Sequence, residues 1–401
     1  MFRISHFMQE LVRPTPAEPR RAPPGPVVIW NLVRRCNLTC RHCYSISGDV
    51  DFPGELSTEE VYRVLDDLKT CRVPALILSG GEPLLRPDIL DISRRARALG
   101  IYLALSTNGT LIDDAWADRI AEIGYDYVGI SLDGLEATHD AFRRRKGAFA
   151  ASLAAVRRCR DRGIKVGLRF TLTKDNAAEL SAILSLAEDE GIDKFYLSHL
   201  NYAGRGNKNR GDDAHFDMTR RAMDLLFDRA YAAAAGSIER EYVTGNNDAD
   251  GPYLLAWVEA RHPERAAHIK AKLEQWGGNA SGESVANIDN LGNVHPDTYW
   301  WHLSLGNVRE RPFSAIWNDL SNPLLAGLRR RPRAVGGRCA SCRHLAICNG
   351  NTRIRAFQVT GDPWAEDPGC YLSDAEIGAT DAAPRVALAA FGRRSHAEAR
   401  L

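Results

Sequence analysis

A regular alternation of short apolar segments and amphipathic segments, beginning at Val27, is the feature of this sequence that most constrains its fold. Runs rich in β-branched and apolar residues predict six strands, at residues 27–33, 75–79, 101–107, 127–132, 165–172 and 194–199. The intervening segments have the apolar periodicity and the start and stop signals of helices. Repeated strand–helix units form parallel sheets with right-handed crossovers. We therefore expect an α/β protein with an open or partial (β/α)6 barrel.

The chain of 401 residues is long enough for a large α/β domain and a smaller one. Six prolines between residues 14 and 26 exclude a helix there and favour extended backbone, so residues 1–26 are predicted to be an arm and a Pro-rich linker. The alternation fades after a last amphipathic stretch. We expect the barrel to cover residues 27–235, a second domain residues 236–380, and a helical or frayed tail residues 381–401.

The composition excludes several kinds of partner. No apolar run approaches the roughly 20 residues of a membrane span, so no transmembrane helix is expected. A net charge of +1 gives no reason to expect nucleic acid as a partner. The first residues lack the features of a secretory signal, which predicts a cytoplasmic protein. Nine cysteines in such a protein indicate metal binding or catalysis rather than disulfides.

Three of these cysteines directly follow the first predicted strand. Cys36, Cys40 and Cys43 form a C-x3-C-x2-C run on a loop at the strand ends where barrels place their chemistry. Three thiolates can ligate three irons of a cubane cluster and leave the fourth iron open to a small chelating molecule, whereas electron-transfer clusters use four cysteines. A zinc site is the alternative, but zinc requires four ligands, usually with pairs of C-x2-C type.

Small and polar residues follow the next three strands. The second strand ends in Gly80-Gly81-Glu82-Pro83, the third in Ser106-Thr107-Asn108-Gly109-Thr110 and the fourth in Ser131-Leu132-Asp133-Gly134. Gly-Gly-Glu-Pro alone is an ordinary turn, but here it lies one strand–helix unit after the cysteines. Together these motifs resemble the radical S-adenosylmethionine (radical SAM) superfamily.

The resemblance implies a role for each of these residues. It makes Cys36, Cys40 and Cys43 the catalytic ligands of a 4Fe-4S cluster, and Arg143 a bidentate partner of the S-adenosylmethionine carboxylate. A solvated basic loop is the alternative for Arg143, which begins an Arg-Arg-Arg-Lys run. The residues implied to bind S-adenosylmethionine are Tyr44, Gly80, Gly81, Glu82, Pro83, Ser106, Asn108, Ser131, Asp133 and Arg143.

A second group of four cysteines follows in the C-terminal part of the chain: Cys339, Cys342, Cys348 and Cys370. Four ligands make a closed site, for which zinc is an alternative. The spacing resembles SPASM and twitch domains, which add auxiliary 4Fe-4S clusters to radical SAM barrels. Asn279, Asp297 and Thr352 stand where the two-cluster version has cysteines. The resemblance therefore implies one auxiliary cluster, and two 4Fe-4S clusters in the whole protein.

Over the whole chain the resemblance extends to the NirJ family of haem d1 biosynthesis, through segments such as 28–32 and 361–364. It implies a radical SAM oxidoreductase or lyase that acts on propionate side chains of didecarboxysiroheme through a 5′-deoxyadenosyl radical. An electron donor such as ferredoxin or flavodoxin is implied as well. Chemistry at an unactivated carbon needs such a cofactor, because no protein base can remove a proton from an ordinary methylene.

The end of the sixth strand supplies the predicted tetrapyrrole contacts, His199, Tyr202 and Arg205. Two alternatives remain open within the same architecture: a peptide-modifying maturase, and a related haem-pathway decarboxylase that differs in which side chain reacts. A non-catalytic iron–sulfur electron carrier is disfavoured, because three cysteines leave one iron open.

Overall fold

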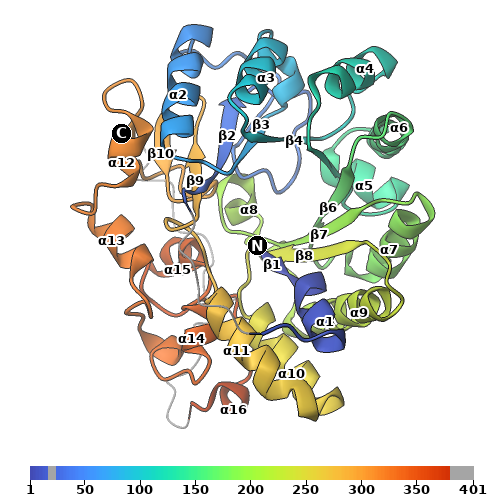
Figure 1. Cartoon of the computed structure of the whole chain (residues 1–401), viewed down its shortest axis with the longest axis vertical. Helices are drawn as coiled ribbons and strands as arrows, with labels where there is room; N and C mark the ends of the chain where they lie inside the picture. The colour runs from blue at the N-terminus through green and yellow to red at the C-terminus, as the bar shows by residue number, and fades with distance from the viewer. Residues whose placement is uncertain (17–23, 380–401) are drawn as a thin grey trace.

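The computed structural model describes residues 1–16 and 24–379 (Figure 1). Its strands form one 11-stranded sheet in the order β1-β8-β7-β6-β5-β4-β3-β2-β9-β10-β11. The strands are β1 (Phe2–Arg3), β2 (Val27–Val33), β3 (Ala75–Gly80), β4 (Tyr102–Thr107), β5 (Tyr127–Ser131), β6 (Val166–Leu172), β7 (Lys194–His199), β8 (Glu241–Gly245), β9 (Val285–Ile288), β10 (Asn293–His295) and β11 (Gly306–Asn307).

Strands β2 to β8 are parallel, and each pairs with the next in the chain. Strands β2 to β7 coincide with the six predicted strands to within one residue at each end. The sheet is not closed, which confirms the partial barrel. The longer helices that connect these strands lie in an arc on their outer side (Figure 1): α2 (Thr58–Thr70), α3 (Ile89–Ala98), α4 (Asp114–Ile123), α5 (Glu136–Arg143), α6 (Ala148–Asp161), α7 (Leu180–Asp189) and α9 (Phe216–Ala235). The short helix α8 (Gly204–Lys208), which follows β7, lies inside this arc (Figure 1).

Helix α2 shows how the sequence fixes these connections. The Ser57 hydroxyl accepts a hydrogen bond from the backbone N–H of Glu60 at 3.2 Å, and the Glu60 carboxylate accepts one from the N–H of Ser57 at 2.8 Å. This capping box satisfies two N–H groups that the first turn leaves without helical partners. The buried side chains recur at helical spacing, so one face packs on the sheet: Val61, Val64, Leu65 and Leu68.

The N-terminal residues contribute to the sheet. Strand β1 pairs antiparallel with β8, and α1 (Ile4–Val12) packs against α9. The sequence analysis predicted an arm and a linker for residues 1–26 and not this helix, because the prolines that follow it favour extended backbone.

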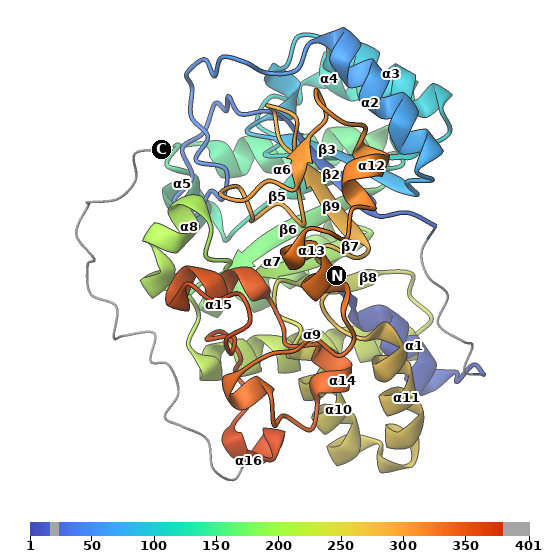
Figure 2. The ribbon, with the colours of Figure 1, turned by 90° about the vertical axis from the view of Figure 1, so that its left-hand side faces the viewer.

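The sheet also continues beyond residue 236. Strand β8 extends it at one edge, and β9 pairs in parallel with β2 at the other. The remaining helices follow β8: α10 (Asp250–Arg261), α11 (Ala266–Trp276), α12 (Phe313–Trp317), α13 (Pro323–Arg329), α14 (Leu345–Cys348), α15 (Arg353–Thr360) and α16 (Asp374–Ile377). Helices α13 to α15 lie on one side of the strands, and helices α4 to α6 lie on the opposite side (Figures 1 and 2). The division into domains stays a prediction, and the predicted tail lies outside the described residues.

No helix in the described ranges is both long enough and apolar enough to cross a bilayer.

A buried ion pair within the C-terminal region also contacts the barrel. The guanidinium of Arg355 donates to both carboxylate oxygens of Asp367 at 2.9 Å and to the carbonyl of Leu200 at 3.4 Å. The two side chains are 1% and 0% exposed. Because Leu200 directly follows β7, the pair fixes α15 against a strand end that faces the barrel mouth.

We expect Arg355→Met to lower the free energy of unfolding by about 3–5 kcal/mol, since it leaves a buried carboxylate without its partner. Arg94→Met is the matched control, because Arg94 pairs with Asp91 at the surface with side chains 49% and 63% exposed; it should change stability by about 1 kcal/mol or less. Chemical denaturation of both variants measures the difference. An equal loss of unfolding free energy in the two variants would show that the buried Arg355–Asp367 pair stabilises the fold no more than a surface pair does.

Candidate active site

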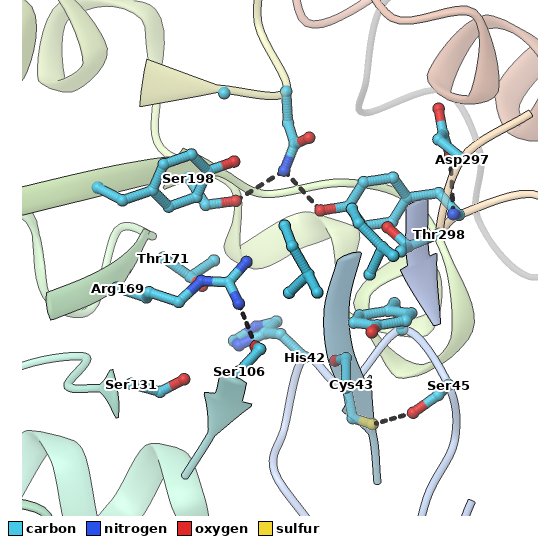
Figure 3. A pocket seen from close by; sticks show the side chains of 18 of the residues that line it. His42, Cys43, Ser45, Ser106, Ser131, Arg169, Thr171, Ser198, Asp297 and Thr298 are labelled. Carbon is cyan, nitrogen blue, oxygen red and sulfur yellow. Dashed lines mark hydrogen bonds between the residues drawn. The ribbon is translucent and has the colours of Figure 1, made fainter. Parts of the chain in front are cut away.

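A cavity of about 320 Å³ opens at the carboxyl ends of the parallel strands (Figure 3). Each strand from β3 to β8 contributes at least one small residue to its wall, including Ser79, Ser106, Ser131, Thr171, Ser198 and Gly245. Hydroxyl groups therefore surround a space that the barrel core does not fill. The strand ends are where sheets of this kind place their chemistry.

The three cysteines of the loop after β2 all line this cavity. The Sγ atom of Cys36 accepts a hydrogen bond from the N–H of Leu38 at 3.4 Å, and that of Cys40 from the guanidinium of Arg143 at 3.5 Å. The Sγ atom of Cys43 lies 3.3 Å from the hydroxyl of Ser45. N–H and O–H groups thus face sulfur atoms that would carry negative charge as metal ligands, so the loop fits a cluster held by three thiolates.

The protein affects the acidity of these thiols unequally. Burial raises the pKa of Cys36, with a smaller contribution from the charge of Glu82, and burial also raises the pKa of Cys40. Burial opposes ionisation of Cys43 too, but the Ser45 hydroxyl, the charge of Arg205 and nearby backbone N–H groups lower its pKa overall. Because thiolates are the metal ligands, cluster binding must release protons at this loop.

Arg205 supports the cysteine loop from outside the cavity. Its guanidinium donates to the carbonyl of Cys40 at 2.7 Å and to that of Ser47 at 2.9 Å, and its own N–H donates to the carbonyl of Cys43 at 2.8 Å. Arg205 is therefore a positioning residue for the loop.

The other two predicted substrate contacts are engaged within the fold. His199 hydrogen-bonds Asp250 at 3.0 Å, and the hydroxyl of Tyr202 donates to Asp213 at 2.8 Å. Neither residue, nor Arg205, is among the described residues that line the cavity. Their role as tetrapyrrole contacts stays a prediction.

The Gly80-Gly81 pair brings the end of β3 against the cysteine loop. A Cβ atom on Gly81 would lie 2.2 Å from the carbonyl oxygen of Arg35, which no side chain tolerates. Both glycines line the cavity. The close approach of the two backbones explains why this turn consists of glycine.

Glu82 lies behind the cavity wall and is fully buried. Its carboxylate accepts hydrogen bonds from the Thr107 hydroxyl at 2.7 Å and from the N–H of Asn108 at 2.9 Å, which ties the end of β3 to the end of β4. Pro83 opens a short 3-10 turn (Pro83–Leu85) after it. Direct contact of Glu82 and Pro83 with a cofactor stays a prediction.

Asp133 and Arg143 form a buried pair beside the cysteines, with side chains 0% and 12% exposed. Asp133 also accepts a hydrogen bond from the N–H of Thr171 at 2.6 Å. Arg143 lines the cavity and contacts Cys40, so it is not part of a solvated basic loop. The carboxylate of Asp133 thus fixes this guanidinium at the cluster loop.

Asn108 and Tyr44 line the cavity near the same loop. The Asn108 amide donates to the side-chain oxygen of Asn37 at 2.9 Å, and the Tyr44 hydroxyl accepts from the amide of Asn31 at 2.7 Å. Ten predicted residues therefore meet around one cavity: Cys36, Cys40, Cys43, Tyr44, Gly80, Gly81, Ser106, Asn108, Ser131 and Arg143.

The sequence missed the opposite wall of the cavity, which comes from the end of β8, the segment before β9 and the segment between β10 and β11. The Asn246 amide donates to the Ser198 hydroxyl and to the Tyr299 hydroxyl, both at 2.7 Å. Asp297 accepts from the N–H of Tyr299 at 2.8 Å, and burial raises the pKa of Asp297. Figure 3 shows Asp297 and Thr298 across the cavity from Ser106 and Ser131. Asn279 and Asp297, which replace expected cysteines, thus belong to this cavity wall.

The four C-terminal cysteines line a separate small cavity of about 20 Å³, which is walled mostly by apolar residues. Burial raises the pKa of every one of these thiols, to about 12 for Cys370. Thiolate ligands suit zinc or an iron–sulfur cluster, and metal binding would release these protons. Thr352, the third replaced position, instead donates its hydroxyl to the carbonyl of Asn246 at 3.0 Å.

Known proteins resemble this chain in the barrel motifs and over almost its whole length. Residues 30–187 match the model of the radical SAM superfamily. The chain is 60% identical over 384 residues to a protein of Dinoroseobacter shibae named pre-heme d1 synthase, with 95% of each chain covered. It is 46% identical over 356 residues to the Fe-coproporphyrin III synthase of Methanosarcina barkeri, with 88% of this chain and 89% of the relative covered.

Among solved structures, the chain resembles Streptococcus suis SuiB bound to S-adenosylmethionine, with a TM-score of 0.69 and 18% identity. The match covers 88% of this chain and 79% of SuiB. At this identity the likeness concerns the fold alone, and it extends through the C-terminal region as well as the barrel.

We expect Glu82→Gln to remove a pH dependence of stability. Burial raises the pKa of Glu82 from 4.5 to about 7, so between these values the folded protein holds a proton that the unfolded chain releases. The stability of the wild type relative to Glu82→Gln should therefore fall as pH rises from about 4.5 to about 7 and then level off, by on the order of 3 kcal/mol. Urea unfolding of the cluster-free protein at several pH values measures this fall.

The variant Glu122→Gln is the control for this experiment, since it alters a carboxylate whose side chain is 70% exposed. It should retain the wild-type dependence on pH. If the stability of Glu82→Gln follows the same curve as wild type, the buried carboxyl is not the group that titrates.

Proposed function

The chain belongs to the radical SAM superfamily, and on this premise we propose that it is a pre-haem d1 synthase that acts on propionate side chains of didecarboxysiroheme. The observation that carries the proposal is 60% identity to the pre-heme d1 synthase of D. shibae across 95% of both chains. The 384 matched residues span both the barrel and the C-terminal region, which together form the cavity. The substrate class therefore follows from the whole chain, rather than from the cysteine motif alone.

The residues of the cavity fit the cofactors that this function requires. Cys36, Cys40 and Cys43 would hold a 4Fe-4S cluster and leave one iron for S-adenosylmethionine. When bound, the cluster and S-adenosylmethionine supply a 5′-deoxyadenosyl radical that can abstract hydrogen from a propionate carbon. Arg143, already fixed by Asp133 beside Cys40, would bind the carboxylate of S-adenosylmethionine as a fork.

The C-terminal segment 297–299 would exclude water from the same cavity. The ring of Tyr299 packs edge-to-face on that of Tyr44 at 5.5 Å, and its hydroxyl is held by Asn246. This contact joins the cysteine loop to the wall across from it. A reactive carbon radical needs such a closed site, because water and stray hydrogen donors would otherwise quench it.

The four half-buried cysteines Cys339, Cys342, Cys348 and Cys370 support a second 4Fe-4S cluster, which would make two clusters per chain. The apolar cavity around them suits a group that transfers electrons while it is shielded from solvent. We also propose that ferredoxin, flavodoxin or a similar protein donates the electrons. The protein is proposed to be cytoplasmic.

A related haem-pathway decarboxylase is the second candidate. The 46% identity to Fe-coproporphyrin III synthase favours it over a peptide-modifying maturase, since the likeness to SuiB concerns the fold alone. Both haem-pathway candidates use a propionate-bearing tetrapyrrole and differ in which side chain reacts.

We expect the two cysteine sets to act independently in cluster binding. Anaerobically reconstituted wild-type protein should contain about eight irons, and replacement of Cys36, Cys40 and Cys43 by Ala should leave about four and abolish cleavage of S-adenosylmethionine. Replacement of the four C-terminal cysteines by Ser should also leave about four. Iron and zinc analysis with a 5′-deoxyadenosine assay measures both. Four irons with one zinc in the wild type would contradict the second cluster.

Anaerobic incubation with didecarboxysiroheme, S-adenosylmethionine and a strong reductant tests the function itself. We expect a change of mass confined to the propionate arms and formation of 5′-deoxyadenosine in step with it. Fe-coproporphyrin III and a small peptide substrate are the comparison arms. Turnover of the peptide without turnover of either tetrapyrrole would overturn the proposal in favour of a maturase.

A further inference from the structure

The cavity holds two arginines in very different surroundings. Arg143 pairs with Asp133, so its charge is compensated within the fold. The second arginine of the cavity is Arg169. The described residues of the cavity wall include no lysine. Met1 also lines the cavity, and burial lowers the pKa of its amino group. Arg169 is therefore the guanidinium of the cavity wall that no carboxylate of the described residues compensates.

The guanidinium of Arg169 has only neutral partners. It donates to the hydroxyl of Ser106, and its Cζ atom lies 5.4 Å from the centroid of the Tyr196 ring. Across residues 1–16 and 24–379, no carboxylate lies within ion-pairing distance of it. A guanidinium has five N–H donors, and Ser106 is the hydrogen-bond partner of Arg169 among the described residues. Figure 3 shows the side chain extending into the cavity toward Ser106.

The neighbouring strands leave room for this side chain. Arg169 lies on β6 and reaches Ser106 on β4, so its stem must cross β5. A Cβ atom on Gly129 of β5 would lie 3.1 Å from the Cδ atom of Arg169, and one on Gly245 of β8 would lie 2.1 Å from the Tyr196 hydroxyl. The fold thus accommodates both the cation and the aromatic ring beneath it.

The acids of the cavity do not compensate Arg169. Asp248 accepts a hydrogen bond from the Asn279 amide at 2.9 Å, and Asp297 accepts one from the N–H of Tyr299. Burial raises the pKa of both carboxyl groups, which favours their neutral forms. A free cation among neutral groups in a half-closed cavity attracts an anionic ligand.

We propose that Arg169 binds a propionate carboxylate of the tetrapyrrole and so selects the substrate by its acid side chains. This inference rests on the proposed function. Carboxylates are the anions that both S-adenosylmethionine and the tetrapyrrole bring, and a guanidinium binds them through two parallel hydrogen bonds. Arg143 contacts Cys40 and is placed for the cofactor carboxylate, which leaves Arg169 for the substrate carboxylate.

The test compares anaerobically reconstituted wild type with Arg169→Met, Arg169→Lys and the surface control Arg94→Met. The probes are didecarboxysiroheme and the same macrocycle with its propionates as methyl esters, titrated by absorbance. S-adenosylmethionine binding is measured separately by equilibrium dialysis. Iron content and circular dichroism establish that each variant is folded.

We expect wild type and Arg94→Met to bind the free acid about tenfold or more tightly than the ester, and Arg169→Met to lose that preference. Arg169→Lys should retain part of it, since it keeps the charge but not the fork. S-adenosylmethionine affinity should stay within about twofold of wild type in the Arg169 variants.

An unchanged preference in Arg169→Met would overturn the inference while leaving the proposed function in place. So would a loss of S-adenosylmethionine binding without a change in tetrapyrrole binding, because Arg169 would then hold the cofactor. Failure of the wild type to bind either macrocycle would contradict the proposed function and the inference together.

Discussion

Parallel pairing of β2 through β8 is the constraint on which the rest of the molecule depends. In a parallel sheet with short crossovers, every strand presents its carboxyl end at the same edge. The cysteine loop after β2, the Gly-Gly turn at the end of β3 and the hydroxyl groups of β4 to β7 are therefore neighbours, although they are spread over residues 36–198. Pairing of β9 with β2 then places the segment after β10 opposite them.

The arginines of this region fall into two groups by what their guanidinium groups bind. Arg143 pairs with a buried carboxylate, Arg205 binds carbonyls of the cysteine loop, and Arg355 pairs with Asp367 at the joint between α15 and the barrel. Each of these holds a part of the site in place. Arg169 differs because its partners are a hydroxyl group and an aromatic ring, and that difference is what assigns it to a ligand.

The sequence predicted the barrel and the cysteine-loop side of the cavity well, because both depend on local patterns. The apolar runs of β2 to β7 follow from short-range periodicity and the capping box of α2 from a four-residue motif, and Cys36, Cys40 and Cys43 are recognised from their spacing and their place after the first strand. The wall formed by Asn246, Asp297 and Tyr299 could not be predicted in this way, since it depends on which distant strands pair.

Arg169 is an intermediate case. Arg169 and Thr171 are two residues apart on a predicted strand, and side chains with that spacing share a face, so an inward orientation could have been inferred. The lack of a carboxylate partner for Arg169 among the described residues can be seen only in the three-dimensional structure. His199, Tyr202 and Arg205 show the opposite effect: their position after β7 suggested the cavity, but internal hydrogen bonds occupy all three.

The central claim is that the barrel cavity brings a propionate carbon of a tetrapyrrole to the site where the adenosyl radical is generated. The most direct measurement uses didecarboxysiroheme deuterated at its propionate methylenes, with unlabelled S-adenosylmethionine in ordinary water, followed by mass analysis of the 5′-deoxyadenosine formed. The account predicts that deuterium appears in 5′-deoxyadenosine in proportion to substrate consumed. Deuterium-free 5′-deoxyadenosine together with full consumption of the tetrapyrrole would contradict it.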